Sequence, residues 1–192
     1  MPLETPFRIE PARLEQPSAK IADVVAEIAA ASATLGRALH PKTAANLADL
    51  VRMMNCYYSN LIEGHDTRPR DIERAMTGDM DQNEERRNLQ REAVAHIRVQ
   101  AEIDRRASAG ALPEPASEEF IRRLHREFYA GAPEDMLRIR GACQEFLMVP
   151  GEWRSQPAHD SAVGRHVPPS SGRVAAFMAA FDERYRLEPL GT

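Results

Sequence analysis

The sequence is poor in several features that would reveal a function directly. It has two cysteines, Cys56 and Cys143, which match neither a metal-ligand spacing nor a disulfide framework. We therefore expect two reduced thiols in a cytoplasmic protein. No apolar run approaches 18 residues, so no membrane span is predicted. The N-terminus also lacks the basic and apolar regions of a signal peptide.

Motifs of zinc, nucleophilic and common nucleotide sites are absent as well. The six histidines have no HExxH spacing and form no cluster with cysteine, so no metal site is expected in this chain. No GxGxxG or GxxxxGK(S/T) loop occurs, so no common phosphate-binding loop is predicted. The net charge of −4 argues against nucleic-acid binding by this segment as its main function.

The pattern of apolar residues predicts a mainly α-helical bundle with one short β-hairpin. Residues 1–17 contain four prolines and are expected to form an extended arm. A helical region then covers 18–110, and a second region covers 115–192 after a linker rich in Ala, Gly and Pro. Helices are expected at about 18–39, 42–63, 69–77, 82–107, 117–129, 133–147 and 172–187.

The expected hairpin lies at about 150–169, where the helical pattern stops at Pro150-Gly151. Glu152-Trp153-Arg154 and 162–166 could form two short strands around a polar turn, and Pro168-Pro169 ends the segment. Pro157 cannot donate a ladder hydrogen bond, so the tip of the hairpin is expected to be irregular.

The helix at 42–63 has two faces when residues are placed 100° apart. One face is apolar and is expected to contact the core, whereas the other is expected to face away from it. The predicted core face comprises Leu47, Leu50, Met54, Tyr57, Tyr58 and Leu61, and the opposite face comprises Asp49, Arg52, Cys56, Ser59 and Glu63.

The end of this helix carries the most informative residues of the chain. Ser59 and Glu63 are one turn apart, and Gly64 can end the helix as the C′ residue. A carboxylate at this end opposes the helix macrodipole, at a cost of about 0.3–1 kcal/mol. The position of Glu63 therefore indicates a cationic partner. By composition alone, a solvated polar stripe explains the same residues.

The segment Tyr58-Ser59-Asn60-Leu61-Ile62-Glu63-Gly64-His65-Asp66-Thr67 resembles a segment of the Fic family of AMP transferases. The resemblance is to members with an N-terminal inhibitory helix that bears (S/T)-x-x-x-E-(G/N).

A second stretch resembles the β-hairpin "flap" of the same family. It comprises Pro150-Gly151-Glu152-Trp153-Arg154 and Val163-Gly164-Arg165-His166-Val167-Pro168-Pro169, followed by a helix at 174–185. The two matches occur in the family's order and together cover about 42–187. They imply a Fic-like fold for the helices around them.

The chain departs from the family at the catalytic signature, H-x-F-x-(D/E)-G-N-G-R-x-x-R, which does not occur. In the family this loop follows the helix that ends here near Leu187. The chain therefore resembles the N-terminal part of a Fic protein, without the catalytic loop and the following helices. No catalytic residue and no AMP-transfer activity are expected in this chain alone.

The resemblance implies a mechanism for the intact protein, which would transfer AMP from ATP and Mg²⁺ to a hydroxyl of a target protein. It implies that Glu63, with Ser59 and Gly64, forms the inhibitory site and pairs with the last arginine of the signature. That arginine would otherwise hold the γ-phosphate. The flap would hold the target segment through Glu152, Trp153, Arg154, Val163 and Gly164. No bound ATP or Mg²⁺ is expected in this chain itself.

Two other interpretations remain open. The chain could be a stand-alone module that lends Glu63 to a separate Fic partner, as an antitoxin does, although flap-like residues argue against it. It could also be a plain helical DNA- or protein-binding domain, although the acidic balance argues against DNA contact by this segment. Independently of these options, Trp153 could be a packing residue at a domain edge. Homo-oligomer formation is left open by the sequence.

Overall fold

The computed structural model describes residues 5–12, 14, 16–141, 144–160, 162 and 164–187. These residues form seven α-helices, three short 3₁₀ turns and one two-stranded antiparallel sheet. The α-helices are α1 (Ala19–Ala38), α2 (Pro41–Ile62), α3 (Pro69–Met76), α4 (Glu84–Ser108), α5 (Glu118–Phe128), α6 (Glu134–Leu137) and α7 (Val174–Tyr185). The mainly helical class predicted from the sequence is confirmed.

Local capping explains where several of these helices begin. Ser18 caps α1 by accepting from the Ile21 amide, and Ser117 caps α5 by accepting from the Phe120 amide. Asn83 accepts from the Arg86 amide and begins α4 with an acidic first turn, as the macrodipole favours. The helices α1 to α5 and α7 all begin and end within about two residues of their predicted bounds, as is usual for helix ends.

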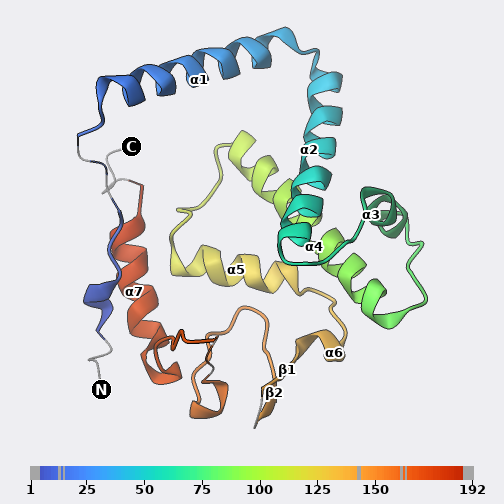
Figure 1. The fold of residues 1–192 in the computed structure, drawn as a ribbon, viewed down its shortest axis with the longest axis vertical. Helices are drawn as coiled ribbons and strands as arrows, with labels where there is room; N and C mark the ends of the chain where they lie inside the picture. The colour runs from blue at the N-terminus through green and yellow to red at the C-terminus, as the bar shows by residue number, and fades with distance from the viewer. Residues whose placement is uncertain are drawn as a thin grey trace.

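The helix α4 is the centre of the helical body, with α2, α3 and α5 packed against it (Figure 1). The core is small and consists of Cys56 from α2, Ile72 from α3, and Ala93 and Ile97 from α4. Cys56 and Ile72 are fully buried. The Cys56 thiol lies 3.6 Å from the Ala93 carbonyl oxygen and donates to it, so α2 and α4 approach closely at this point.

The structure corrects the predicted orientation of α2. The face that was expected to be solvated contributes Cys56 to the core, whereas Leu47, Leu50, Tyr58 and Leu61 are exposed. Of the predicted core face, Tyr57 packs against the core. Cys56 is small enough for the backbones of α2 and α4 to approach at this point, which a leucine there would prevent.

The β-hairpin also lies elsewhere than predicted. The strands β1 (Arg138–Arg140) and β2 (Glu145–Leu147) pair with Ile139 opposite Phe146. They occupy the end of the segment predicted to be one helix at 133–147, of which only α6 is helical. No strand is found among the described residues of 150–169, apart from a single bridge residue, His166. The prediction of strands at 152–154 and 162–166 is therefore wrong for the residues described.

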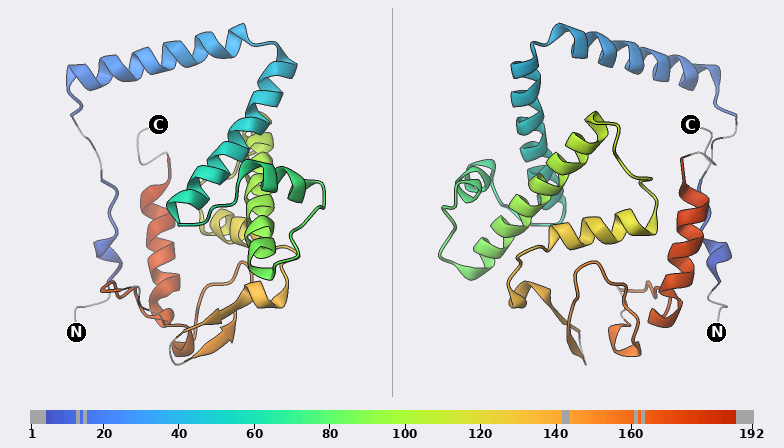
Figure 2. Two further views of the ribbon diagram at one scale, coloured as in Figure 1. Left: turned by 45° about the vertical axis from the view of Figure 1, so that its right-hand side comes forward. Right: turned by 180° about the vertical axis from the view of Figure 1, so that it is seen from behind.

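The N-terminal arm returns to the far end of the chain and lies beside α7 in both views of Figure 2. The Arg184 guanidinium donates to the carbonyl oxygens of Pro6 and Ile9 at 2.8 and 2.7 Å, and it lies over the Phe7 ring. The arm contains a 3₁₀ turn, Pro6–Arg8, rather than being wholly extended. The helix α1 then spans from the arm to α2 (Figure 1).

The packing predicts that two isoleucine truncations will have very different effects on stability. Ile72→Ala removes a fully buried side chain and should lower the free energy of unfolding by about 2–5 kcal/mol. Ile62→Ala truncates a side chain that is 84% exposed at the end of α2, so it should change stability by no more than about 0.5 kcal/mol. Urea unfolding followed by circular dichroism measures both. Equal losses would contradict the described core.

Candidate functional site

The C-terminal end of α2 is closed by a hydrogen-bonded cap. Gly64 adopts φ +85°, and its amide donates to the Leu61 carbonyl oxygen. The His65 amide donates to the Asn60 carbonyl oxygen at 2.8 Å, which completes a Schellman motif. The predicted role of Gly64 as the residue that ends the helix is confirmed.

This cap fixes Glu63 as the last residue before the turn, with its amide donating to the Ser59 carbonyl oxygen. The side chains of Ser59 and Glu63 are exposed and lie one turn apart, as predicted. No ion pair to Glu63 is found within the described part of the chain. The carboxylate thus stands in solvent at the negative end of a helix, where a cation would stabilise it.

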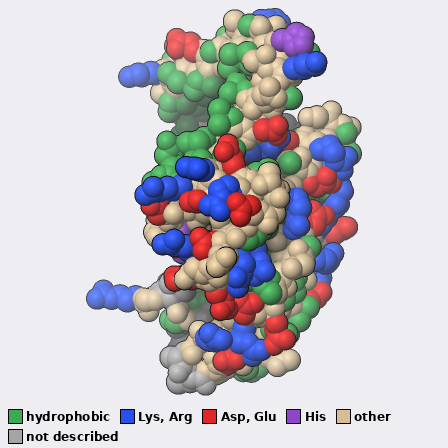
Figure 3. Space-filling view, turned by 90° about the vertical axis from the view of Figure 1, so that its right-hand side faces the viewer, with side chains coloured by type: hydrophobic (Ala, Val, Ile, Leu, Met, Phe, Trp, Pro, Cys, Tyr) green, Lys and Arg blue, Asp and Glu red, His purple; other side chains and the backbone are tan. Residues whose placement is uncertain are grey.

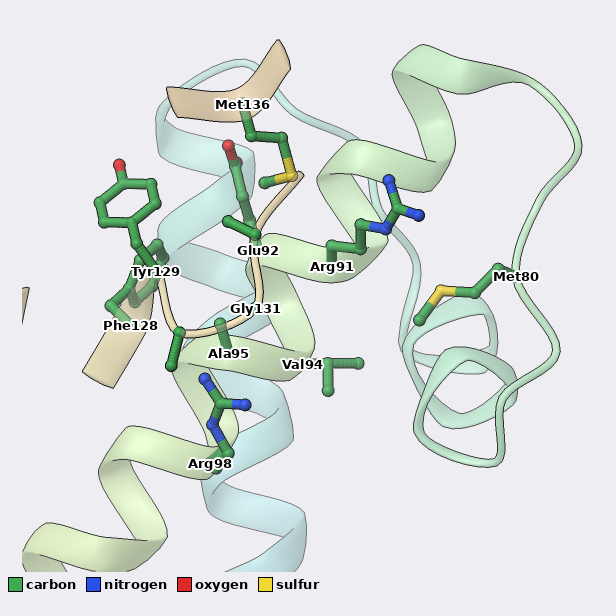
Figure 4. A pocket seen from close by; sticks show the side chains of 12 residues that line it. Met80, Arg91, Glu92, Val94, Ala95, Arg98, Phe128, Tyr129, Gly131 and Met136 are labelled. Atoms are coloured by element: carbon green, nitrogen blue, oxygen red, sulfur yellow. The ribbon is translucent and has the colours of Figure 1, made fainter. Parts of the chain in front are cut away.

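A small cavity of about 160 Å³ lies between α4 and the C-terminal end of α5 (Figure 4). Glu92 and Tyr129 line it together with Arg91, Arg98 and Met136. Burial raises the pKa of Glu92, and the nearby His65 charge opposes that shift. Burial also raises the pKa of Tyr129, with a further contribution from Glu92. His65, in the turn after Glu63, is therefore near enough to Glu92 for their charges to interact.

The segment predicted to be the flap packs against α5 instead of forming a free hairpin. The Arg122 guanidinium donates to the Gly151 carbonyl oxygen at 2.7 Å and to the Glu152 carboxylate at 2.6 Å. The Trp153 indole N–H donates to the Glu118 carboxylate at 2.8 Å. Glu152 and Trp153, two of the five predicted target-contact residues, are thus each hydrogen-bonded to α5.

Arg154 ties the same segment to the start of α7. Its guanidinium donates to the Asp160 carboxylate at 3.1 Å, to the Ser171 hydroxyl at 3.2 Å and to the Pro169 carbonyl oxygen. Hydrogen bonds from the Ser171 hydroxyl and amide, with the Arg154 charge, lower the pKa of Asp160. Arg154 therefore stabilises this loop by joining residues 154, 160, 169 and 171 through hydrogen bonds.

The remaining two predicted flap residues are Val163 and Gly164. Gly164 lies in a turn with φ +58°, and there is open space where a Cβ on this residue would lie. Val163 lies outside the described residues. The structure does not bring the flap residues to Glu63, because α2 packs against α4 whereas Gly151, Glu152 and Trp153 are hydrogen-bonded to α5.

A larger cavity of about 540 Å³ was not predicted from the sequence. Trp153, Phe146 and Val149 supply apolar lining, and Arg122, His125 and Glu152 supply polar groups. This size and mixture are typical of ligand sites. The Phe146 and His159 rings, which both line it, stack on each other with centroids 4.3 Å apart. The misplaced hairpin is the reason that it was missed, since β1 and β2 form one wall.

His125 and Gly151 contact each other in the wall of this cavity. The Gly151 amide donates to Nδ1 of His125 at 2.8 Å, which requires the neutral ring protonated at Nε2. A Cβ on Gly151 would lie 2.9 Å from the Arg122 carbonyl oxygen. Gly151 also has φ +82°. Glycine is therefore favoured at this position both by the left-handed backbone and by the lack of space for a Cβ.

Among the residues that the structure describes, no group of three or more His, Cys, Asp or Glu side chains is arranged to hold a metal ion. The described helices include none with the length and apolar character that a membrane crossing demands. Comparison with protein-family models, with curated proteins and with solved structures found no match to this chain.

We predict that Gly151→Ala will be more harmful than Gly164→Ala, although both glycines have positive φ. Each substitution costs about 1–2 kcal/mol for the left-handed backbone. Only Gly151→Ala adds a clash with the Arg122 carbonyl oxygen, at 2.9 Å. Thermal unfolding measures the difference. A Gly164 variant that is the less stable of the two would contradict the close approach to α5.

The His125 contact also predicts a loss of stability in mild acid. Burial lowers the pKa of His125 in the folded state, so the neutral ring is favoured there. The stabilisation is present above the unfolded pKa of about 6.5 and is lost as the pH falls below it. His125→Phe should reduce the stability change between about pH 7.5 and 5.5, measured by urea unfolding. Part of the pH dependence of stability should remain in the His125→Phe variant, because burial also lowers the pKa of His96.

Proposed function

We propose that this chain is the regulatory and target-contacting front portion of a Fic-type protein that transfers AMP from ATP to protein hydroxyls. The observation that supports this most directly is the capped end of α2. It presents an exposed glutamate one turn after a serine, without a cation to pair with among the described residues. An arginine outside this chain would satisfy that carboxylate.

The proposed inhibition is a competition between two anions for one arginine. Glu63 would form a charge-assisted, bidentate pair with the last arginine of the catalytic signature. The γ-phosphate of ATP needs the same guanidinium, so a Glu63 pair would leave the nucleotide without it. Because phosphoryl-type transfer depends on in-line positioning, the misplaced nucleotide would react slowly. ATP and Mg²⁺ belong to the intact protein in this proposal.

Two residues next to Glu63 support docking of another protein surface at this end of α2. Leu61 and Ile62 are 45% and 84% exposed, so apolar side chains flank the carboxylate. Burying them would remove water around the Glu63–arginine pair and strengthen it. The docking surface would come from the rest of the same protein.

A stand-alone antitoxin-like module is the second candidate, because the same surface could meet a separate Fic partner. The hydrogen bonds that join Glu152 and Trp153 to α5 weaken the argument that this chain carries a free flap. The two candidates differ in whether the arginine lies on the same polypeptide. Sequencing the gene beyond the codon for Thr192 separates them, because a following His-x-Phe and Gly-Asn-Gly-Arg indicates the first.

The inhibitory assignment predicts that Glu63→Gly and Glu63→Gln will raise AMP transfer in the intact protein, measured with labelled ATP and Mg²⁺. Glu73→Gln is the matched control, because Glu73 is another exposed glutamate, on α3. It should leave the activity unchanged. The 192-residue chain alone should give no labelled product. Variants at Glu63 that remain as inactive as the parent would contradict the inhibitory role, and self-labelling by the chain would contradict the proposed division of the protein.

A further inference from the structure

The 540 Å³ cavity is bounded by α5, by the strands β1 and β2, and by the segment that follows β2. Two aromatic rings in its wall, those of Trp153 and Phe146, are held by neighbours. The Trp153 N–H donates to the Glu118 carboxylate at 2.8 Å, and the Phe146 ring stacks on His159. Rings held at a cavity wall favour a flat aromatic ligand, because the ligand gains from stacking and from burial of its apolar faces.

Two polar side chains of α5 line the same cavity. Arg122 and His125 are three positions apart, so they lie next to each other on one face of the helix. The Gly151 backbone holds both of them: its carbonyl oxygen accepts from Nε of Arg122 at 2.7 Å, and its amide donates to Nδ1 of His125 at 2.8 Å. A ligand that binds these two side chains would therefore restrict them little further.

These bonds leave hydrogen-bond donors without a partner. Because Nδ1 of His125 accepts, the ring proton lies on Nε2, and no acceptor for it is found within the described part of the chain. The Arg122 guanidinium uses Nη2 to bind the Glu152 carboxylate at 2.6 Å, and its Nη1 likewise has no acceptor among the residues described. A ligand that displaces water here must therefore supply acceptor oxygens.

The charges of the cavity favour an anion over a cation. Two guanidinium groups, of Arg122 and Arg154, and one carboxylate, of Glu152, line it. Glu152 is paired with Arg122, and Arg154 is paired with Asp160. An ammonium group would thus meet no uncompensated carboxylate among these groups, whereas a carboxylate could accept charge-assisted bonds from a guanidinium.

We propose that this cavity binds a small aromatic acid. The ring of the ligand would lie against Trp153 and Phe146, and its carboxylate would accept from Nε2 of His125 and from Nη1 of Arg122. Binding at this cavity requires neither the proposed AMP transfer nor Glu63.

The first test uses the fluorescence of Trp153, which is the only tryptophan of the chain and lines the cavity. The probe is phenylpropionate, and the matched compound is phenylpropylamine, in which an aminomethyl group replaces the carboxylate. The acid should change the emission of Trp153 saturably, and calorimetry should show that the amine binds at least about tenfold more weakly. The proposal is overturned if the acid shows no saturable binding up to about 10 mM, or if the amine binds equally well.

The second test locates the bound probe, because an aromatic compound can also adhere to the exposed apolar side chains of α1 and α2 in the upper part of Figure 3. Val149→Phe fills part of the cavity and should weaken phenylpropionate binding at least about tenfold. Val167→Phe, at a 77% exposed valine outside the lining, is the matched control and should bind as the parent does. Equal affinities of the two variants would overturn the proposed location.

The third test concerns the donor on α5. His125→Phe keeps a ring but removes the Nε2–H, so it should weaken binding of phenylpropionate about tenfold and leave the weak binding of phenylpropylamine unchanged. Urea unfolding establishes that the variant is folded at the pH of the titration. An unchanged affinity for the acid, or an equal loss for both compounds, would contradict the contact between His125 and the carboxylate.

Discussion

The close approach of α2 to α4 at Cys56 and Ala93 determines which side chains of α2 are buried and which are exposed. The thiol of Cys56 reaches the Ala93 carbonyl oxygen because both side chains are small. Burial raises the pKa of that thiol to about 11, so it acts as a small apolar residue rather than a nucleophile. Once α2 is seated in this rotation, the directions of Ser59, Glu63 and the leucines are fixed.

The sequence predicts this protein best where local chemistry alone determines the structure. The caps at Ser18 and Ser117 and the glycine turn at Gly64 depend on residues within one turn, and these were correctly predicted. The exposure of Ser59 and Glu63 was also correct. The predicted reason was wrong, because the apolar arc that was expected to be buried is largely exposed. Side-chain size, which a two-class polarity pattern ignores, determined the packing.

The misplaced hairpin has a related cause. Strands as short as β1 and β2 cannot show a reliable period of two, and Arg138-Ile139-Arg140 lies in a stretch of good helix formers. Contacts distant in sequence hold the 150–170 segment without a sheet: Arg122 binds Gly151, and Arg154 binds Ser171. The larger cavity follows from the same distant contacts. No signal within the segment itself could have indicated it.

The Glu63 carboxylate and the exposed helix α1 lie at opposite ends of the bent pair formed by α1 and α2 (Figure 1). The helix α2 has 22 residues and is therefore about 33 Å long. Its first turn follows α1 directly, whereas Glu63 lies at its far end. Ser59 and Glu63 are exposed although they lie on the same side of α2 as the buried Cys56, because residues three and seven positions apart share one helix face. Access of an arginine to Glu63 therefore does not require α1 to move.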